Sequence, residues 1–283
     1  MKLGELLTSA TAILTKAGIE TPRLDARLLI AEAIGKNPSF ILMHDDYSVS
    51  VNEEEKISSF IARRAQREPV SRIIGVRDFW KLSFCLNEDT LDPRPDSETL
   101  VEAVVHSFAA QTQPLNILDL GTGTGCLLLA LLSELKTAKG LGIDISPKAI
   151  AAAKANADRN GLSAKAEFIA ASWHTLPANA VKTYDIIISN PPYIPQEELS
   201  SLAPEVRCFD PEAALNGGED GLTAYREISL LLPSLLCEKG SFFCEIGKGQ
   251  EDDVTAIMTS AGLHLNKMHK DFGGITRCLH FQK

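Results

Sequence analysis

The sequence predicts an α/β protein with a mainly parallel sheet, preceded by a small helical bundle and joined to it by a β-hairpin. In residues 96–283, segments of strand character alternate with segments of helical character, which predicts parallel strands covered by helices on both faces. Residues 1–70 instead repeat apolar side chains at helical spacing, and residues 71–95 hold short β-like runs. We therefore expect three parts with those boundaries.

Four helices are expected in the first part. Apolar side chains recur at helical spacing over residues 6–14, and Pro22 begins a second helical pattern that Gly35 ends. A short helix is expected over residues 39–43. A longer one over residues 52–67 has acidic residues at its start and arginines near its end, an order that complements the helix dipole.

The predicted linker consists of two β-like runs, residues 70–76 and 79–86. These runs predict a hairpin that joins the two domains. After it, Arg94 and Asp96 stand next to prolines, whose fixed φ angles present both side chains from a stiff backbone.

A helix over residues 98–106 opens the last part, and residues 264–271 and 275–281 around Gly273-Gly274 predict a terminal hairpin. Between them we expect strands at residues 116–120, 140–145, 166–171, 184–189 and 241–246, and helices at residues 127–135, 147–160, 223–236 and 250–261.

Composition excludes several classes of protein. The hydrophobic fraction of 45% suffices for a sizeable core, and the net charge of -9 argues against direct nucleic-acid binding, which needs a basic face. The six cysteines include no Cys-x-x-Cys pair, so neither a disulfide framework nor a zinc site is expected. The sequence shows no secretory start and no apolar run long enough to span a membrane. We expect a cytoplasmic protein without a membrane partner and without a catalytic metal.

A glycine loop follows the strand at residues 116–120. Gly121, Gly123 and Gly125 alternate with threonines, which lets the backbone turn tightly and lets a ligand approach it. The third glycine comes one position too early for a dinucleotide-binding Gly-x-Gly-x-x-Gly, so no pyrophosphate site is implied. Asp119, directly before the loop, suits a cationic ligand better than a phosphate.

Asp144 ends the next strand, about 20 residues further on, where a carboxylate can hold the hydroxyls of a ribose. Trp173 follows the third strand and Asn190 the fourth. Because ligands of open α/β sheets bind at the carboxyl ends of the strands, we expect the loop and these three residues to form one site.

The sequence Asn190-Pro191-Pro192-Tyr193 follows a buried strand. The prolines have no backbone N–H, so the strand tip presents carbonyl oxygens beside the Asn190 amide and the Tyr193 ring. Such a tip can accept hydrogen bonds from an NH2 group while the ring covers its flat face. The arrangement suits methyl transfer to a planar, weakly nucleophilic nitrogen.

Together these motifs resemble the class I methyltransferases that use S-adenosylmethionine, which have a Rossmann-like sheet. More narrowly, the chain is similar to the protein-glutamine N5-methyltransferases that modify peptide-chain release factors. The glycine loop marks only the superfamily, and Asn-Pro-Pro-Tyr is shared with adenine-N6 methyltransferases. The resemblance covers nearly the whole chain. It is carried by residues 93–98, which are the most discriminating, and by residues 119–125, 190–193, 205–207, 210–215 and 217–221.

The resemblance implies methyl transfer from S-adenosylmethionine to the side-chain N5 of the glutamine in the Gly-Gly-Gln motif of release factors. Asp144 is then expected to hold the ribose and Trp173 to flank the adenine, although family members often carry an acid where Ser172 stands here. The implied cofactor-binding residues are Asp119, Gly121, Thr122, Gly123, Thr124, Gly125, Asp144, Trp173 and Asn190. The implied catalytic residues are Asn190, Pro191, Pro192 and Tyr193, the first two as acceptors for the amide hydrogens.

The helical domain at residues 1–70 is expected to select the protein substrate, with Arg63, Arg64 and Arg67 as candidate contacts. Three alternatives stay open. The first is a glutamine methyltransferase acting on a ribosomal protein, but that group typically lacks the sequence found here at residues 93–98. The second is an adenine-N6 methyltransferase of nucleic acids, which the acidic charge balance of this chain argues against. A binding module that lost its activity conflicts with the intact motifs.

Overall fold

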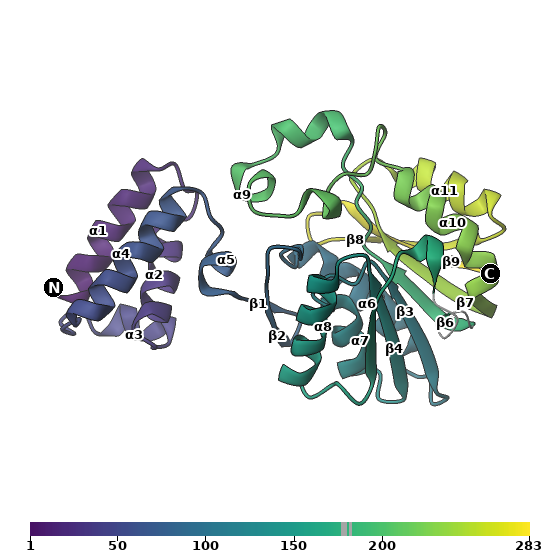
Figure 1. Ribbon diagram of the computed structural model, residues 1–283, viewed down its shortest axis with the longest axis horizontal. Helices are drawn as coiled ribbons and strands as arrows, with labels where there is room; N and C mark the ends of the chain where they lie inside the picture. The colour runs from purple at the N-terminus through teal and green to yellow at the C-terminus, as the bar shows by residue number, and fades with distance from the viewer. Residues whose placement is uncertain (177–179, 181–182) are drawn as a thin grey trace. The chain divides into compact units, whose positions relative to one another are not determined.

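The computed structural model describes residues 1–176, 180 and 183–283. The chain divides into two compact units (Figure 1). The first comprises residues 1–76 together with residues 203–209, and the second comprises residues 77–202 and 210–283. The return of residues 203–209 to the first unit had no signal in the sequence.

The first unit is helical, as the apolar spacing predicts. Its core contains the fully buried side chains of Leu14, Leu29 and Ile41. Ser50 and Glu53 form a capping box at the start of the longest helix, which satisfies backbone N–H groups that the helix itself leaves free. The helices of residues 1–76 are α1 (Leu3–Lys16), α2 (Pro22–Ala33), α3 (Pro38–Met43), α4 (Val51–Ala65) and α5 (Val70–Ile74).

Arg64 is buried within this unit. Its Nε donates to Asp25 Oδ2 over 2.7 Å, and its guanidinium also pairs with Glu205 at 3.2 Å from the short helix α9 (Pro204–Arg207). Arg67 pairs with the same Glu205 carboxylate at 3.0 Å. Arg64 is therefore a buried ion-pair residue, and a contact between it and a substrate stays a prediction.

The strand predicted over residues 70–76 is also wrong, because this segment forms α5. Pro69 precedes the helix, and Gly75, with φ of 76°, ends it in the left-handed conformation. A helix of five residues is too short to show periodicity, and its β-branched side chains mimic a strand.

The hairpin itself is present, formed by β1 (Val76–Phe79) and β2 (Leu82–Cys85). The backbone N–H of Cys85 donates to Asn156 Oδ1 over 2.7 Å, and Phe84 is fully buried in the core beside the sheet. By these contacts the hairpin packs as part of the second unit.

The second unit contains a seven-stranded sheet in the order β5-β4-β3-β6-β7-β9-β8 (Figure 1). The first five strands in that order are parallel to their neighbours, whereas β9 is antiparallel to both β7 and β8. This confirms the predicted parallel sheet and its terminal hairpin. The strands are β3 (Leu115–Leu120), β4 (Ala138–Asp144), β5 (Ala166–Ala170), β6 (Tyr184–Ser189), β7 (Leu236–Glu245), β8 (His264–Lys270) and β9 (Thr276–Gln282).

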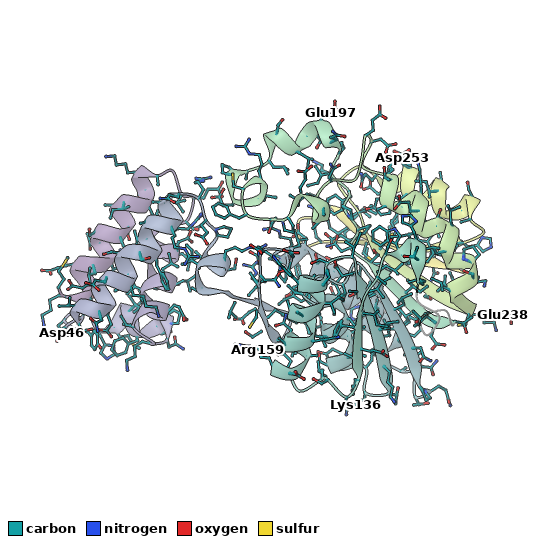
Figure 2. The ribbon with its side chains drawn as sticks, viewed as in Figure 1. Asp46, Lys136, Arg159, Glu197, Glu238 and Asp253 are labelled. Carbon is teal, nitrogen blue, oxygen red and sulfur yellow. The ribbon has the colours of Figure 1, made fainter. Side chains whose placement is uncertain are left out.

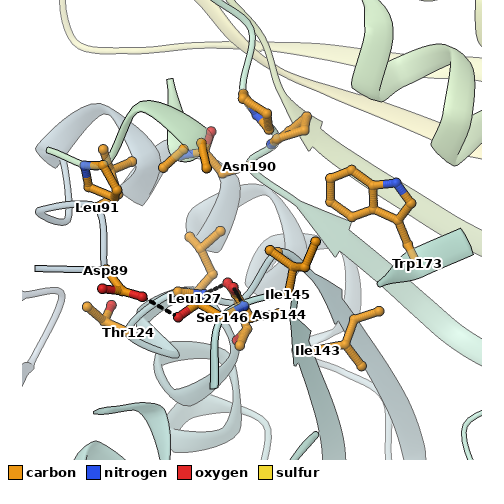
Figure 3. Close-up of a pocket in the computed structure, with 18 of the residues that line it drawn as sticks. Asp89, Leu91, Thr124, Leu127, Ile143, Asp144, Ile145, Ser146, Trp173 and Asn190 are labelled. Carbon is orange, nitrogen blue, oxygen red and sulfur yellow. Dashed lines mark hydrogen bonds between the residues drawn. The ribbon is translucent and has the colours of Figure 1, made fainter. Parts of the chain in front are cut away.

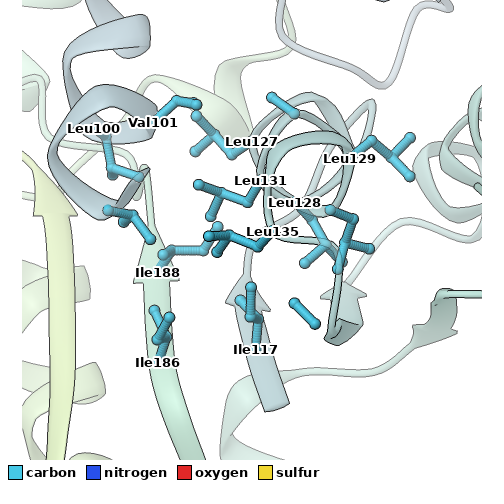
Figure 4. Packing of buried hydrophobic residues seen from close by; sticks show 14 of the residues in the cluster. Leu100, Val101, Ile117, Leu127, Leu128, Leu129, Leu131, Leu135, Ile186 and Ile188 are labelled. Carbon is cyan, nitrogen blue, oxygen red and sulfur yellow. The ribbon is translucent and has the colours of Figure 1, made fainter. Parts of the chain in front are cut away.

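Helices cover both faces of this sheet. Ile186 and Ile188 of β6 pack into the core of one face, and Ile187 between them packs into the core of the other, as the alternation of side chains along a strand requires. Figure 4 shows Leu127 and Leu131 on the first of these faces. The helices α6 (Glu98–Phe108), α7 (Cys126–Glu134) and α8 (Pro147–Arg159) cover that face, and α10 (Thr223–Leu235) and α11 (Glu251–Ser260) cover the other.

Charged side chains such as Lys136, Glu238 and Asp253 are exposed at the surface of the second unit (Figure 2). In the part of the chain that the structure describes, no helix combines the length and the apolar character needed to cross a membrane.

Candidate active site

A cavity of about 420 Å³ opens at the carboxyl ends of β3, β4, β5 and β6 (Figure 3). Cavities of this size hold small organic ligands. It lies where the four strand-end motifs were expected to meet. Among its lining residues are Gly121, Thr122, Gly123, Thr124, Asp144, Trp173, Asn190, Pro191 and Pro192. Three of the predicted site residues do not line the cavity. They are Asp119, Gly125 and Tyr193, and each lies within two positions in the sequence of a residue that does.

The glycine loop requires residues without a Cβ. Gly121, Gly123 and Gly125 have φ angles of 80°, 53° and 79°, in the left-handed region that glycine tolerates best. Gly125 faces the core, because a Cβ there would lie 3.3 Å from Ala153 and Phe168. The first two glycines therefore shape the cavity wall, and the third allows α7 to pack closely.

Asp144 is fixed by backbone donors. Its Oδ2 accepts from Gly123 N and its Oδ1 from Ser146 N, both over 2.9 Å, while burial raises the pKa of its carboxyl. The Ser146 hydroxyl donates to Asp89 Oδ2 over 2.7 Å, so a second carboxylate stands at the same end of the cavity (Figure 3). Nothing in the sequence marks Asp89 as a site residue, because its contacts depend on the fold.

Asp119 lies under the glycine loop with 1% of its surface exposed. Thr122 Oγ1 donates to its Oδ2 over 2.6 Å, whereas its Oδ1 has no hydrogen-bond partner in the described part of the chain. Burial raises the pKa of this carboxyl to about 7. An unpartnered buried carboxylate oxygen is costly, and a cationic group nearby would offset that cost.

Trp173 lies at the other end of the cavity, in the turn after β5. Its Nε1 donates to Glu227 Oε2 over 3.0 Å, and His174 Nε2 lies 3.1 Å from the same oxygen. Glu227 projects from α10 and lines the cavity. It thus supplies a carboxylate beside Trp173, where Ser172 supplies none.

Asn190 is oriented by Ser97. The Asn190 Nδ2 donates to Ser97 Oγ over 3.2 Å, so its Oδ1 remains for another donor. Tyr193 packs partly buried against the core, and its main-chain oxygen accepts from Gln250 Nε2 over 3.0 Å. The strand tip is therefore held rigidly from both sides.

The segment before α6 forms the remaining wall. Arg94 is ion-paired with Asp210, and the proline-rich motif that marked this segment in the sequence gave no hint that it lines the cavity. Residues of the segment in the wall are Asp89, Leu91, Pro93, Arg94 and Ser97, and residues Pro211, Ala213 and Ala214 face the same space.

The sequence of the chain matches known protein families. Residues 5–75 match the family model of the PrmC N-terminal domain, and residues 111–258 match that of a methyltransferase domain. The release factor glutamine methyltransferase of Rhodospirillum rubrum is 46% identical over 280 residues, which cover 98% of this chain and 84% of that protein. The chain belongs to the release factor glutamine methyltransferase family. A second member, from Agrobacterium fabrum, is 43% identical and covers 98% of this chain and 96% of its own length.

Among solved structures, a methyltransferase from Pyrococcus furiosus aligns with a TM-score of 0.53 at 15% identity, over 80% of this chain and 98% of that chain. This likeness shows the fold alone, and it agrees with the predicted class I methyltransferase sheet.

The residues in and behind this cavity fit S-adenosylmethionine in three respects. A carboxylate with an unpartnered oxygen, Asp119, lies by the loop for the cationic end of the cofactor. Asp144, whose carboxylate is held by backbone donors, and the indole of Trp173 both line the cavity, so an acceptor for hydroxyl groups and a flat apolar face are both present.

Proposed function

We propose that this chain transfers a methyl group from S-adenosylmethionine to the side-chain N5 of the glutamine in the Gly-Gly-Gln motif of peptide-chain release factors. The observation that supports this proposal most is the orientation of Asn190. Its Nδ2 donates to Ser97, so its amide oxygen is left for a substrate at the cavity wall beside Pro191. Family membership supports the same substrate class, because the relatives are release factor glutamine methyltransferases.

We propose that different residues of the site bind the methionine, ribose and adenine parts of the cofactor. The glycine loop and Asp119 hold the methionine end, Asp144 holds the ribose, and Trp173 with Glu227 holds the adenine. The cofactor supplies a methyl group made electrophilic by its sulfonium. The backbone bonds to both Asp144 oxygens support its assignment, because they present the carboxylate in one orientation.

For the glutamine, this chain must position a poor nucleophile. An amide nitrogen is weakly nucleophilic because its lone pair is delocalised into the carbonyl. Asn190 Oδ1 and the Pro191 carbonyl accept the two amide hydrogens and so aim the nitrogen, while Tyr193 supports the strand tip and excludes water. Holding reacting groups in one geometry is a large part of the catalysis available to such a site.

We also propose that the helical unit at residues 1–70 selects the protein substrate. It contains none of the cavity residues, and a free glutamine is too small to need it. A truncated chain that begins at Arg77 should bind cofactor and lose most activity on the intact release factor. Full activity of that chain would contradict this role.

The function is tested by incubating the protein with labelled S-adenosylmethionine and one of four acceptors. These are a purified release factor, the same factor with alanine in place of the Gly-Gly-Gln glutamine, a purified ribosomal protein mixture, and an adenine-containing oligonucleotide. Label is expected on the first acceptor alone. Equal labelling of the alanine factor, or preferential labelling of either of the last two acceptors, would contradict the proposal.

A further inference from the structure

The side chain of Gln250, the residue before α11, joins three segments of the second unit at the Asn-Pro-Pro-Tyr sequence. Its Oε1 accepts from Gly247 N over 2.9 Å. Its Nε2 donates to Tyr193 O over 3.0 Å and to Gly221 O over 3.4 Å. Because a backbone N–H can only donate, Gly247 requires the oxygen of the amide to face it and leaves the NH2 group for the two carbonyls.

The main chain of residues 190–193 has few donors of its own. Two of these residues are prolines, which have no N–H and cannot continue the hydrogen bonds of a strand. The strand β6 ends at Ser189, and pairing with a loop begins again at Ile194, whose N donates to Leu215 O over 3.0 Å. Gln250 bonds the chain between these two points.

Residues 217–221 pack against the same part of the chain. A Cβ on Gly221 would lie 2.4 Å from Tyr193 O, and a Cβ on Gly217 would lie 2.8 Å from Tyr193 Cα. Only glycine allows so close an approach. The structure describes residues 217–221 in full, and they do not line the cavity, so this approach to Tyr193 accounts for the glycines of their motif.

Gln250 does not line the cavity either, and its bonds reach the site through the main chain. Tyr193 is separated from Asn190 by two prolines, whose φ angles are nearly fixed. A displacement of the Tyr193 carbonyl is therefore passed along the chain to Asn190.

We propose that Gln250 is a positioning residue for methyl transfer. It holds the Tyr193 carbonyl against residues 217–221 and thereby sets the position of the two oxygens proposed to accept the substrate amide hydrogens. It touches neither the substrate nor the cofactor. This inference rests on the proposed function, because it assumes that those two oxygens receive the glutamine amide.

Substitution of Gln250 by glutamate removes the donor and keeps the size of the side chain. The carboxylate of Q250E, ionised at about pH 8, still accepts from Gly247 but has no hydrogen for Tyr193 O. We expect single-turnover methylation of the release factor, with both reactants saturating, to slow roughly tenfold or more, because small displacements of a reacting group are costly. Q250M, which is uncharged and of similar length, should slow it as well, and it decides the test if Q250E does not fold.

Affinity separates positioning from a general loss of structure. The KM for the release factor and the affinity for S-adenosylhomocysteine should stay within about twofold in both variants, because Gln250 binds neither ligand. Gln282 is the matched control, since its Nε2 donates to Lys239 O over 3.4 Å beside the start of β7, away from the site. Q282E should methylate at the rate of the unchanged protein.

Gly221→Ala disturbs the same carbonyl from the other side. Gly262→Ala is its control, because Gly262 has a φ of 86°, similar to the 76° of Gly221, but a Cβ there meets no atom within 4 Å. Both variants place alanine in the left-handed region, and only Gly221→Ala should slow methylation. Equal rates in the two variants would show that the approach to Tyr193 does not matter for the reaction and would overturn the proposal.

A double-mutant cycle with Asn190 tests the route. Q250E should slow transfer by a smaller factor in Asn190→Ala than in the unchanged protein, because one of the two positioned oxygens is already missing. The same factor in both backgrounds would overturn the proposal. So would a normal rate in folded Q250E or Q250M, or a loss of cofactor affinity as large as the loss of rate.

The unchanged protein is the control for the function itself. If it methylates the release factor and folded Q250E does so equally well, only the role of Gln250 fails. If the unchanged protein leaves the release factor unmethylated, the proposed function fails and the role of Gln250 fails with it.

Discussion

The Trp173 indole donates a hydrogen bond to the Glu227 carboxylate over 3.0 Å and joins the turn after β5 to α10 at one end of the cavity. Both contacts of Glu227, from Trp173 and His174, fall on Oε2. Its Oε1 is thus available to a donor on the ligand, such as the amino group of an adenine.

Glu227→Gln should weaken binding of S-adenosylhomocysteine by about 1 kcal/mol, roughly fivefold, because Glu227 is one third exposed and its charge is partly screened. Calorimetry measures this, and Glu238→Gln at the exposed surface is the matched control. The analogue with hypoxanthine in place of adenine lacks the amino group. It should bind Glu227→Gln and the unchanged protein with similar affinity. Equal losses for the two ligands would contradict an adenine contact.

Asp144→Ala should weaken cofactor binding by roughly 1.5–3 kcal/mol for each charged hydrogen bond lost to the ribose. Asp144→Asn is the matched variant, since it retains one acceptor and should lose less. Titration of S-adenosylhomocysteine gives both values. Unchanged affinity in Asp144→Ala would make Asp144 a strand-end residue that only fixes Gly123 and Ser146.

Asn190→Ala should slow methyl transfer on the order of a hundredfold, the usual effect of removing one hydrogen-bonding group at a reacting centre. Cofactor affinity should change by only a few-fold, because the ribose and adenine are held elsewhere. Single-turnover rates and calorimetry separate the two effects. A near-normal rate would remove Asn190 from the mechanism.

The raised pKa of Glu245 predicts that the free energy of unfolding depends on pH. Burial raises its pKa from 4.5 to about 7, with Ser97, Arg277 and Tyr193 opposing the increase and the nearby Asp96 adding to it. Because the folded protein holds this proton more tightly than the unfolded chain, the stabilisation is complete below pH 4.5 and is lost as pH rises through 7. The loss amounts to about 3 kcal/mol.

Glu245→Gln cannot ionise, so it should gain stability relative to the unchanged protein between pH 5 and pH 8. Asp119, whose pKa burial also raises to about 7, contributes equally to both proteins and cancels in the comparison. Denaturant unfolding at the two pH values measures the difference. The same stability difference at both values would show that Glu245 keeps an ordinary pKa.

Much of the fold was predictable because residues close together in the sequence determine where its strands and helices begin and end. The strand over Tyr184–Ser189 has the predicted bounds, and the glycine loop, Asp144, Trp173 and Asn190 meet at one sheet edge because parallel strands place their carboxyl ends together. The segment at residues 70–76 was mispredicted because a five-residue helix leaves no period to detect.

The residues that were missed act over long sequence separations. Ser97 meets Asn190 across 93 residues, and Glu227 meets Trp173 across 54. No motif links the members of either pair, so only the packing of α6 and α10 around the sheet brings them together. Glu245 stands at the end of an apolar strand, and nothing in the sequence shows that the fold buries its carboxylate.

The central claim is that this chain methylates one amide nitrogen of a protein substrate. It is tested most directly by fragment mass spectra of a release factor treated with the protein and S-adenosylmethionine. The account predicts a single added methyl group on the side-chain nitrogen of the Gly-Gly-Gln glutamine, and its absence when the protein is Asn190→Ala. A methyl group on any other residue, or on that glutamine with Asn190→Ala at an undiminished rate, would contradict it.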